Sequence, residues 1–149
     1  ATFTGEEIHR YPTANVGIAV AAPAGLVVPV IRSAARLTIQ EIAGARADVV
    51  GRARAGKLTL QDFEGGTFTI SNLGMFGVEQ FVAVLNPPQV AILAVGAVKQ
   101  EAVVVDGEID VAPIMRMTLS CDHRAIDGVE GADFLRTLVA FVEEPALAL

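Results

Sequence analysis

A histidine and an aspartate stand four residues apart near the C-terminal end of the sequence, in the segment His123-x-x-x-Asp127-Gly128. Imidazole titrates near neutral pH, so a histidine here could take a proton from a thiol or hydroxyl and return it. Asp127 could fix the local turn by pairing with a cation or with backbone N–H groups. The alternative is structural, with Asp127 as a helix N-cap and His123 as a packed side chain. The spacing alone leaves both interpretations open.

Two further side chains could take part in chemistry. Ser71 ends a predicted strand and precedes a loop with two glycines, so its hydroxyl could donate a hydrogen bond to an oxyanion. Bonding to local backbone is the favoured alternative for a serine in this position. Cys121 lies two residues before His123 and could form a nucleophilic pair with it. Adjacent side chains on one strand rarely reach that geometry, so a small buried apolar role is favoured for Cys121.

The elements that must position these residues follow from hydrophobic patterning. Strands are predicted at 16–22, 26–31, 67–71, 90–98, 103–105, 108–111 and 114–121. The first two look apolar on both faces, as central strands do. A helix is predicted from Thr38, where Thr38 and Glu41 match a capping box, to about Gly56. A second helix is predicted over 128–144, with its apolar face turned inward. This order indicates a mixed β-sheet sandwich with helices packed on one face.

Composition narrows the class of protein. The 149 residues suit one domain, and the hydrophobic share of 52% with a mean hydropathy of +0.51 is high for a soluble monomer, which favours an oligomer. The net charge of −6, without any basic run, argues against a nucleic-acid partner. One cysteine fits a reducing compartment, and two histidines give poor support for a metal site. Prolines and a glycine in the uncharged stretch 11–31 indicate turns, not a membrane span, and no signal peptide is expected.

Five ordered blocks resemble one family. They are Asn15–Val20, Gly25–Arg32, Thr69–Gly74, Asn86–Gln89 and Leu119–Gly128. The chain resembles the catalytic domain of the dihydrolipoyl acyltransferases, the E2 components of 2-oxo acid dehydrogenase complexes, in the chloramphenicol acetyltransferase-like superfamily. One His-x-x-x-Asp-Gly motif is a weak signal, but five blocks in order are specific. The resemblance implies an α/β fold of the α+β type, a chloramphenicol acetyltransferase-like two-layer sandwich.

The resemblance also implies roles for individual residues. His123 matches the base that takes the proton from the thiol of coenzyme A, and Ser71 matches the serine that donates to the tetrahedral oxyanion. Asp127 matches the aspartate that stabilises the active-site loop. Cys121 and Leu93 fall near positions that contact coenzyme A in relatives. The acyl group is carried by a lipoyl group on a separate domain, and no metal is implied. An acetyl group is favoured over branched-chain or succinyl groups.

The resemblance finally implies an assembly. We expect a homotrimer that builds a larger shell, with His123 from one copy and Ser71 from its neighbour in each site. The lipoyl domain and the E1 and E3 components are the expected partners, in the cytoplasm of a bacterium. Residues 1–149 are expected to be a single catalytic domain without the family's N-terminal part, lipoyl domain or peripheral-subunit-binding domain. Two alternatives remain, an assembly core without turnover and an acyltransferase acting on a free small molecule.

Overall fold

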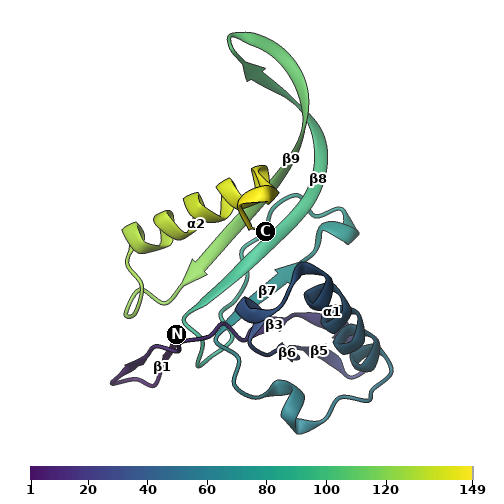
Figure 1. Ribbon diagram of the computed structural model, residues 1–149, viewed down its shortest axis with the longest axis vertical. Helices are drawn as coiled ribbons and strands as arrows, with labels where there is room; N and C mark the ends of the chain where they lie inside the picture. Colours follow the sequence, from purple (N-terminus) through teal and green to yellow (C-terminus); the bar gives the residue numbers. More distant parts are fainter. Residues whose placement is uncertain (149) are drawn as a thin grey trace.

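A mixed five-stranded sheet in the order β6-β3-β7-β8-β9 lies at the centre of the computed structural model, which describes residues 1–148 (Figure 1). Its strands are β6 (Val30–Ile31), β3 (Val16–Ile18), β7 (Phe68–Asn72), β8 (Ala91–Val105) and β9 (Glu108–Cys121). The three inner strands are parallel to one another, and each outer strand is antiparallel to its neighbour. The predicted mixed sheet of an α+β fold is confirmed.

The hairpin formed by residues 16–31 is interrupted at Pro29. Beyond β3 and β6 the same register continues into a small separate sheet of β4 (Val20–Ala22) and β5 (Gly25–Val27). Pro29 has no N–H to donate, although its carbonyl still accepts from the N–H of Ile18 at 2.9 Å. The two predicted strands and their turn are confirmed. The prediction that both are central was wrong, because β6 is an edge strand and Leu26 is 75% exposed.

The last two strands form one long hairpin that projects beyond the rest of the sheet (Figure 1). The turn at Asp106-Gly107 has positive φ at both residues, as the sequence predicts for a two-residue hairpin. The strands predicted separately at 90–98 and 103–105 merge into β8, and those at 108–111 and 114–121 merge into β9. Cross-strand pairing therefore continues through the polar residues that appeared to separate them.

The first helix, α1 (Ile39–Arg54), begins where its capping box predicts. The hydroxyl of Thr38 accepts from the Glu41 N–H at 3.2 Å, and the Glu41 carboxylate accepts from the Thr38 N–H at 2.8 Å. Val49 and Ala53 are buried, and the helix contacts β4 and β6. This packing places α1 against the strands that precede it in the chain.

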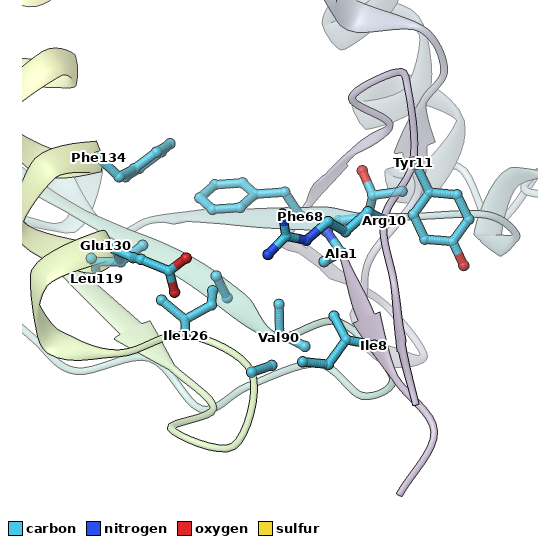
Figure 2. A pocket seen from close by; sticks show the side chains of 14 residues that line it. Ala1, Ile8, Arg10, Tyr11, Phe68, Val90, Leu119, Ile126, Glu130 and Phe134 are labelled. Carbon is cyan, nitrogen blue, oxygen red and sulfur yellow. The ribbon is translucent and has the colours of Figure 1, made fainter. Parts of the chain in front are cut away.

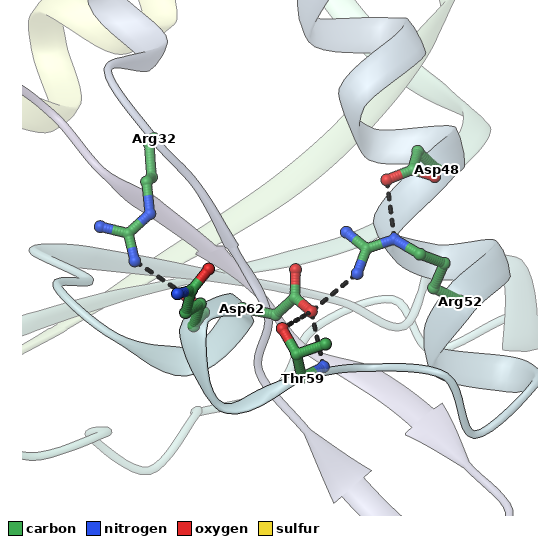
Figure 3. Close-up of polar contacts among 6 residues, drawn as sticks. Arg32, Asp48, Arg52, Thr59 and Asp62 are labelled. Carbon is green, nitrogen blue, oxygen red and sulfur yellow. Dashed lines mark hydrogen bonds and ion pairs between the residues drawn. The ribbon is translucent and has the colours of Figure 1, made fainter.

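The 3-10 turn Leu60–Phe63, which follows α1, is joined to the helix by an ion pair (Figure 3). The Arg52 guanidinium donates to Asp48 at 2.9 Å and to Asp62 at 2.7 Å. Asp62 also accepts from the N–H and hydroxyl of Thr59, at 2.7 and 2.9 Å. Arg52 and these donors hold the pKa of Asp62 well below its usual range. Thr59 and Asp62 thus form a capping box at the start of the 3-10 turn Leu60–Phe63.

The second helix, α2 (Gly128–Glu143), packs on β9 (Figure 1). Its Phe134 ring stacks at a tilt on Phe68 of β7, with 5.6 Å between the ring centroids. The prediction that its apolar face is turned inward holds only in part. Leu135 and Leu138 are half-buried, whereas Phe134 and Val142 are 43% and 46% exposed.

The remaining elements are short. A two-stranded sheet joins β1 (Thr2–Phe3) to β2 (Ile8–His9), and 3-10 helices span Ala34–Arg36, Leu60–Phe63, Gly74–Phe76 and Pro145–Ala148. Over residues 1–148, neither α-helix is long and apolar enough to cross a bilayer.

Candidate active site

His123 lies in the exposed turn between the end of β9 and the start of α2. Asp127 ends this turn as the N-cap of α2. One oxygen of its carboxylate accepts from the N–H groups of Val129 and Glu130, both at 2.9 Å. The Glu130 carboxylate accepts in return from the Asp127 N–H at 3.2 Å, which completes a capping box. Asp127 therefore fixes the turn through backbone N–H groups, and His123 is not a packed side chain.

The cap role of Asp127 leads to a first prediction. Asp127→Ala should lower the free energy of unfolding by about 1 kcal/mol, because two N–H groups of α2 lose their acceptor. Asp127→Asn is the matched control, since an amide oxygen can accept the same bonds. Chemical denaturation of the two variants measures the difference. Equal losses in both would mean that the charge matters and the cap does not.

His123 and Asp127 line a pocket of about 320 Å³ between β9 and the first turns of α2. Its other walls are small or apolar residues, namely Leu119, Cys121, Ile126, Gly128, Gly131, Ala132 and Leu135. Burial raises the pKa of the Cys121 thiol, so the thiolate that a nucleophile needs is disfavoured. This supports the apolar role for Cys121, which here forms part of the wall beside His123.

A second pocket of about 390 Å³ lies on the other side of Ile126 (Figure 2). Phe68 and Phe134 face its interior, and Arg10 and Glu130 stand at its edge. It shares Leu119, Ile126 and Gly131 with the His123 pocket. Although it is the larger of the two, none of the five residues predicted for the site lines it.

Ser71 lies on the opposite face of the sheet from the His123 pocket. In β9, Leu119 and Cys121 face α2, since both lie 3.8 Å from where a Cβ on Gly131 would stand. Leu119 pairs with Leu93 of β8, and Leu93 pairs with Ile70 of β7, so these three side chains are on the α2 face of the sheet. Because successive side chains of a strand point to opposite faces, the next residue of β7, Ser71, points away from α2.

On the Ser71 face, the sheet is covered by the segment 78–85. The side chain of Gln80 donates to Thr118 at 3.5 Å, and the hydroxyl of Ser120 donates to the Ala83 carbonyl at 2.8 Å. The buried residues Ala83, Ile92 and Ala94 form a small core there. Ser71 is half-buried on this face and pairs with Ala94 of the small core.

Ser71 and His123 of one chain are therefore too far apart to act on one carbon atom. Ser71 is level with Thr118, two strands away, so roughly 14 Å separates it from Cys121, and His123 lies beyond. A base and an oxyanion donor must each come within about 3 Å of the reacting group. One chain brings together His123, Asp127 and Cys121, and leaves Ser71 apart.

Leu93, the fifth predicted site residue, lies in β8, pairs with Leu119 of β9 and is 5% exposed. It lines neither pocket. A coenzyme A contact for Leu93 therefore stays a prediction. Among residues 1–148, no group of three or more His, Cys, Asp or Glu side chains is placed to hold a metal ion.

Sequence reasoning assigned no role to three residues that shape the site. Asp122 and Arg124 flank His123 and pair with each other, with N–O distances of 2.9 and 2.6 Å. The sequence Asp122-His123-Arg124, with opposite charges on either side of the candidate base, was the signal that could have predicted this ion pair. Glu130 completes the cap of α2, and the Asp-x-x-Glu pattern was visible in the sequence.

A family profile for the catalytic domain of 2-oxoacid dehydrogenase acyltransferases matches residues 1–149. The acetyltransferase component of the pyruvate dehydrogenase complex of Rickettsia bellii (strain RML369-C) is 43% identical over 149 residues, covering 100% of this chain and 36% of the relative. The succinyltransferase component of the 2-oxoglutarate dehydrogenase complex of Azotobacter vinelandii is 41% identical over 149 residues, with 100% and 37% covered. The chain thus spans about a third of the length of the curated relatives it matches.

Solved structures show the same fold. A probable dihydrolipoamide acetyltransferase of Listeria monocytogenes 4b F2365 superposes with a TM-score of 0.91 at 40% identity, covering 96% of this chain and 61% of that one. The dihydrolipoamide acetyltransferase of Azotobacter vinelandii gives 0.91 at 34%, with 98% and 60% covered. The cubic core of a pyruvate dehydrogenase multienzyme complex gives the same four values.

The Azotobacter structure belongs to a study of a serine, a histidine and an asparagine in that enzyme's catalytic mechanism. Those three residues have the same separations along their chain as Ser71, His123 and Asp127 have here. An asparagine thus takes the place of Asp127.

Proposed function

Because the chain belongs to the 2-oxoacid dehydrogenase acyltransferase family, as its catalytic domain, we propose that it transfers an acyl group between a dihydrolipoyl thioester and coenzyme A. One observation carries the proposal. The exposed side chain of His123, in a turn fixed by the α2 cap, lines a pocket. Its separations along the sequence from Ser71 and Asp127 equal those of the three residues studied in the Azotobacter enzyme.

In the proposed reaction, the His123 imidazole takes the proton of the coenzyme A thiol. The thiolate sulfur then forms a bond to the carbonyl carbon of the acyl-dihydrolipoyl thioester, and the carbonyl oxygen becomes an oxyanion. When the oxyanion collapses, the bond to the dihydrolipoyl sulfur breaks and that sulfur receives the proton from His123. His123 thus acts first as base and then as acid, and ends in its starting state.

The oxyanion is stabilised by Ser71 of a neighbouring subunit. Ser71 and the His123 pocket lie on opposite faces of one sheet, so a complete site needs the serine of one copy beside the histidine of another. A homotrimer, in which each of three sites is shared by two subunits, satisfies this requirement.

Exposed apolar side chains near Ser71 support such an interface. Met75 and Phe76, in the loop after β7, are 69% and 71% exposed, and Val82 and Val84 of the covering segment are 76% and 89% exposed. Large exposed apolar patches are uncommon on monomers and mark protein interfaces. Packing a second copy here would bury the patch and bring another histidine toward Ser71.

The wider assembly follows from the family. We infer that trimers build a larger shell, as the superposition on a cubic core supports, and that a lipoyl group on a separate domain delivers the acyl group. The E1 and E3 components of the complex are the inferred partners, in the cytoplasm of a bacterium. Coenzyme A is the second substrate and would reach His123 through its pocket.

The acyl group is proposed to be acetyl. The Rickettsia relative is named an acetyltransferase, but the Azotobacter relative of nearly equal identity is named a succinyltransferase. Transfer from acetyl-, succinyl- and isobutyryl-coenzyme A to dihydrolipoamide distinguishes these groups. We expect the highest kcat/KM with acetyl-coenzyme A. A higher value with succinyl-coenzyme A would reverse the assignment, and no transfer from any donor by an intact oligomer would favour an assembly core without turnover.

A further inference from the structure

The turn that carries His123 is organised around Asp122. Two nitrogens of the Arg124 guanidinium donate to the Asp122 carboxylate, at 2.9 and 2.6 Å. The backbone N–H of Arg124 donates to the same carboxylate at 3.1 Å. The Asp122 carbonyl accepts from the N–H groups of Ala125 and Ile126, at 2.9 and 3.0 Å. Five hydrogen bonds to one residue thus define the path of the chain on both sides of His123.

The Arg124 guanidinium also lies over the Phe3 ring, 4.4 Å from its centroid. Phe3 is itself held in place, since its N–H donates to the Pro88 carbonyl at 2.8 Å. Next to Pro88, the buried Gln89 accepts from the Thr69 hydroxyl at 2.6 Å. Arg124 therefore connects the turn, through β1, to β7 in the middle of the sheet.

We propose that Arg124 is a positioning residue for the base: it holds the His123 turn in place through Asp122 and Phe3, and it balances the charge of Asp122, the residue next to His123 in the chain. This inference rests on the proposed function, in which His123 is the base. Only an arginine can supply both contacts, because its planar group binds a carboxylate with two nitrogens while its face stacks on a ring.

The charge balance has a consequence for pH dependence. Asp122 has a pKa of about 2, owing mainly to its hydrogen bonds from Arg124, so the pair carries no net charge under assay conditions. Removing Arg124 leaves an unbalanced carboxylate on the residue that precedes His123. A nearby negative charge favours the protonated form of an imidazole, which cannot act as base. The other charged groups at the turn, Asp127 and Glu130 of the α2 cap, stay unchanged.

The test compares pH profiles of kcat/KM for acyl transfer by the assembled protein. In Arg124→Gln, the acid limb should move to higher pH by about half a unit to one unit, as expected for one unbalanced charge near the surface. In Asp122→Asn it should move to lower pH by a similar amount. The double variant should return it to the wild-type position. An acid limb at the wild-type pH in both single variants would overturn the charge part of the proposal.

Two further variants test the geometric part. Arg124→Lys keeps the charge but loses the paired nitrogens, so the acid limb should stay in place while kcat falls about tenfold. Phe3→Leu should lower kcat about two- to fivefold at unchanged KM, whereas Phe3→Trp keeps a ring for the cation and should retain kcat. Wild-type kcat in both Arg124→Lys and Phe3→Leu would overturn the positioning role, even if Arg124→Gln failed to fold.

His123→Ala, assayed in parallel, separates the two levels of the proposal. If it keeps the wild-type rate, the proposed function fails and Arg124 has no base to position. If it is inactive while the Arg124 variants behave as wild type, only the positioning role fails.

Discussion

Replacing His123 with alanine is expected to lower the rate of acyl transfer about 10²- to 10⁴-fold without dissolving the oligomer, since a positioned base contributes that much. The side chain is exposed at the mouth of its pocket, and its loss leaves the Asp127 cap intact. Structure and assembly should therefore survive while the coenzyme A thiol loses its base. Steady-state kinetics, with sedimentation of the same sample, measures both quantities.

The matched control is the only other histidine of the sequence. His9 lies in β2, is 48% exposed and stands 3.6 Å from the Glu7 carboxylate. His9→Ala should leave the rate within about twofold of wild type, because surface changes away from a site have small effects. If His123→Ala retained more than about a tenth of the wild-type rate, the base role would be refuted.

Ser71→Ala is expected to lower kcat about 10²- to 10³-fold, the usual cost of removing one oxyanion donor. KM should change little, because the donor acts on charge that develops in the transition state. Ser120→Ala is the matched control. Its hydroxyl lies on the same face of the sheet, two strands away, and donates to the Ala83 carbonyl at 2.8 Å. It should affect stability more than kcat.

An unchanged kcat in Ser71→Ala, with an altered melting temperature, would return Ser71 to the structural role that strand-end serines often have. A loss of equal size in Ser120→Ala would point instead to a general disturbance of this face of the sheet.

Local features of the fold could be predicted because they depend on a few consecutive residues. The capping box of Thr38 and Glu41 and the turn at Asp106-Gly107 both occur where their patterns predict. The two interpretations of the His123 segment turned out to be compatible in part. Asp127 is the N-cap that the structural alternative required, and by capping α2 it defines the turn that exposes His123.

Other features could not be predicted, because they depend on how distant strands align. Hydrophobicity alone suggested a central strand around Leu26, yet Leu26 pairs with Ala21 in the separate two-stranded sheet of β4 and β5 and is 75% exposed. The opposite orientations of Ser71 and Leu119 follow only from the pairing of β7, β8 and β9. The family resemblance predicted that Ser71 and His123 act together, and the register explains why one chain cannot unite them.

The most direct test of a shared site is to combine two inactive variants in one assembly. Co-expressing Ser71→Ala and His123→Ala chains in equal amounts should restore about a quarter of wild-type activity, because three quarters of random trimers are mixed and each mixed ring has one junction with both residues intact. Each variant alone should remain inactive. If co-expression gives no more activity than the separate variants, although mixed assemblies form, then His123 and Ser71 act within one chain or not together, and the account is wrong.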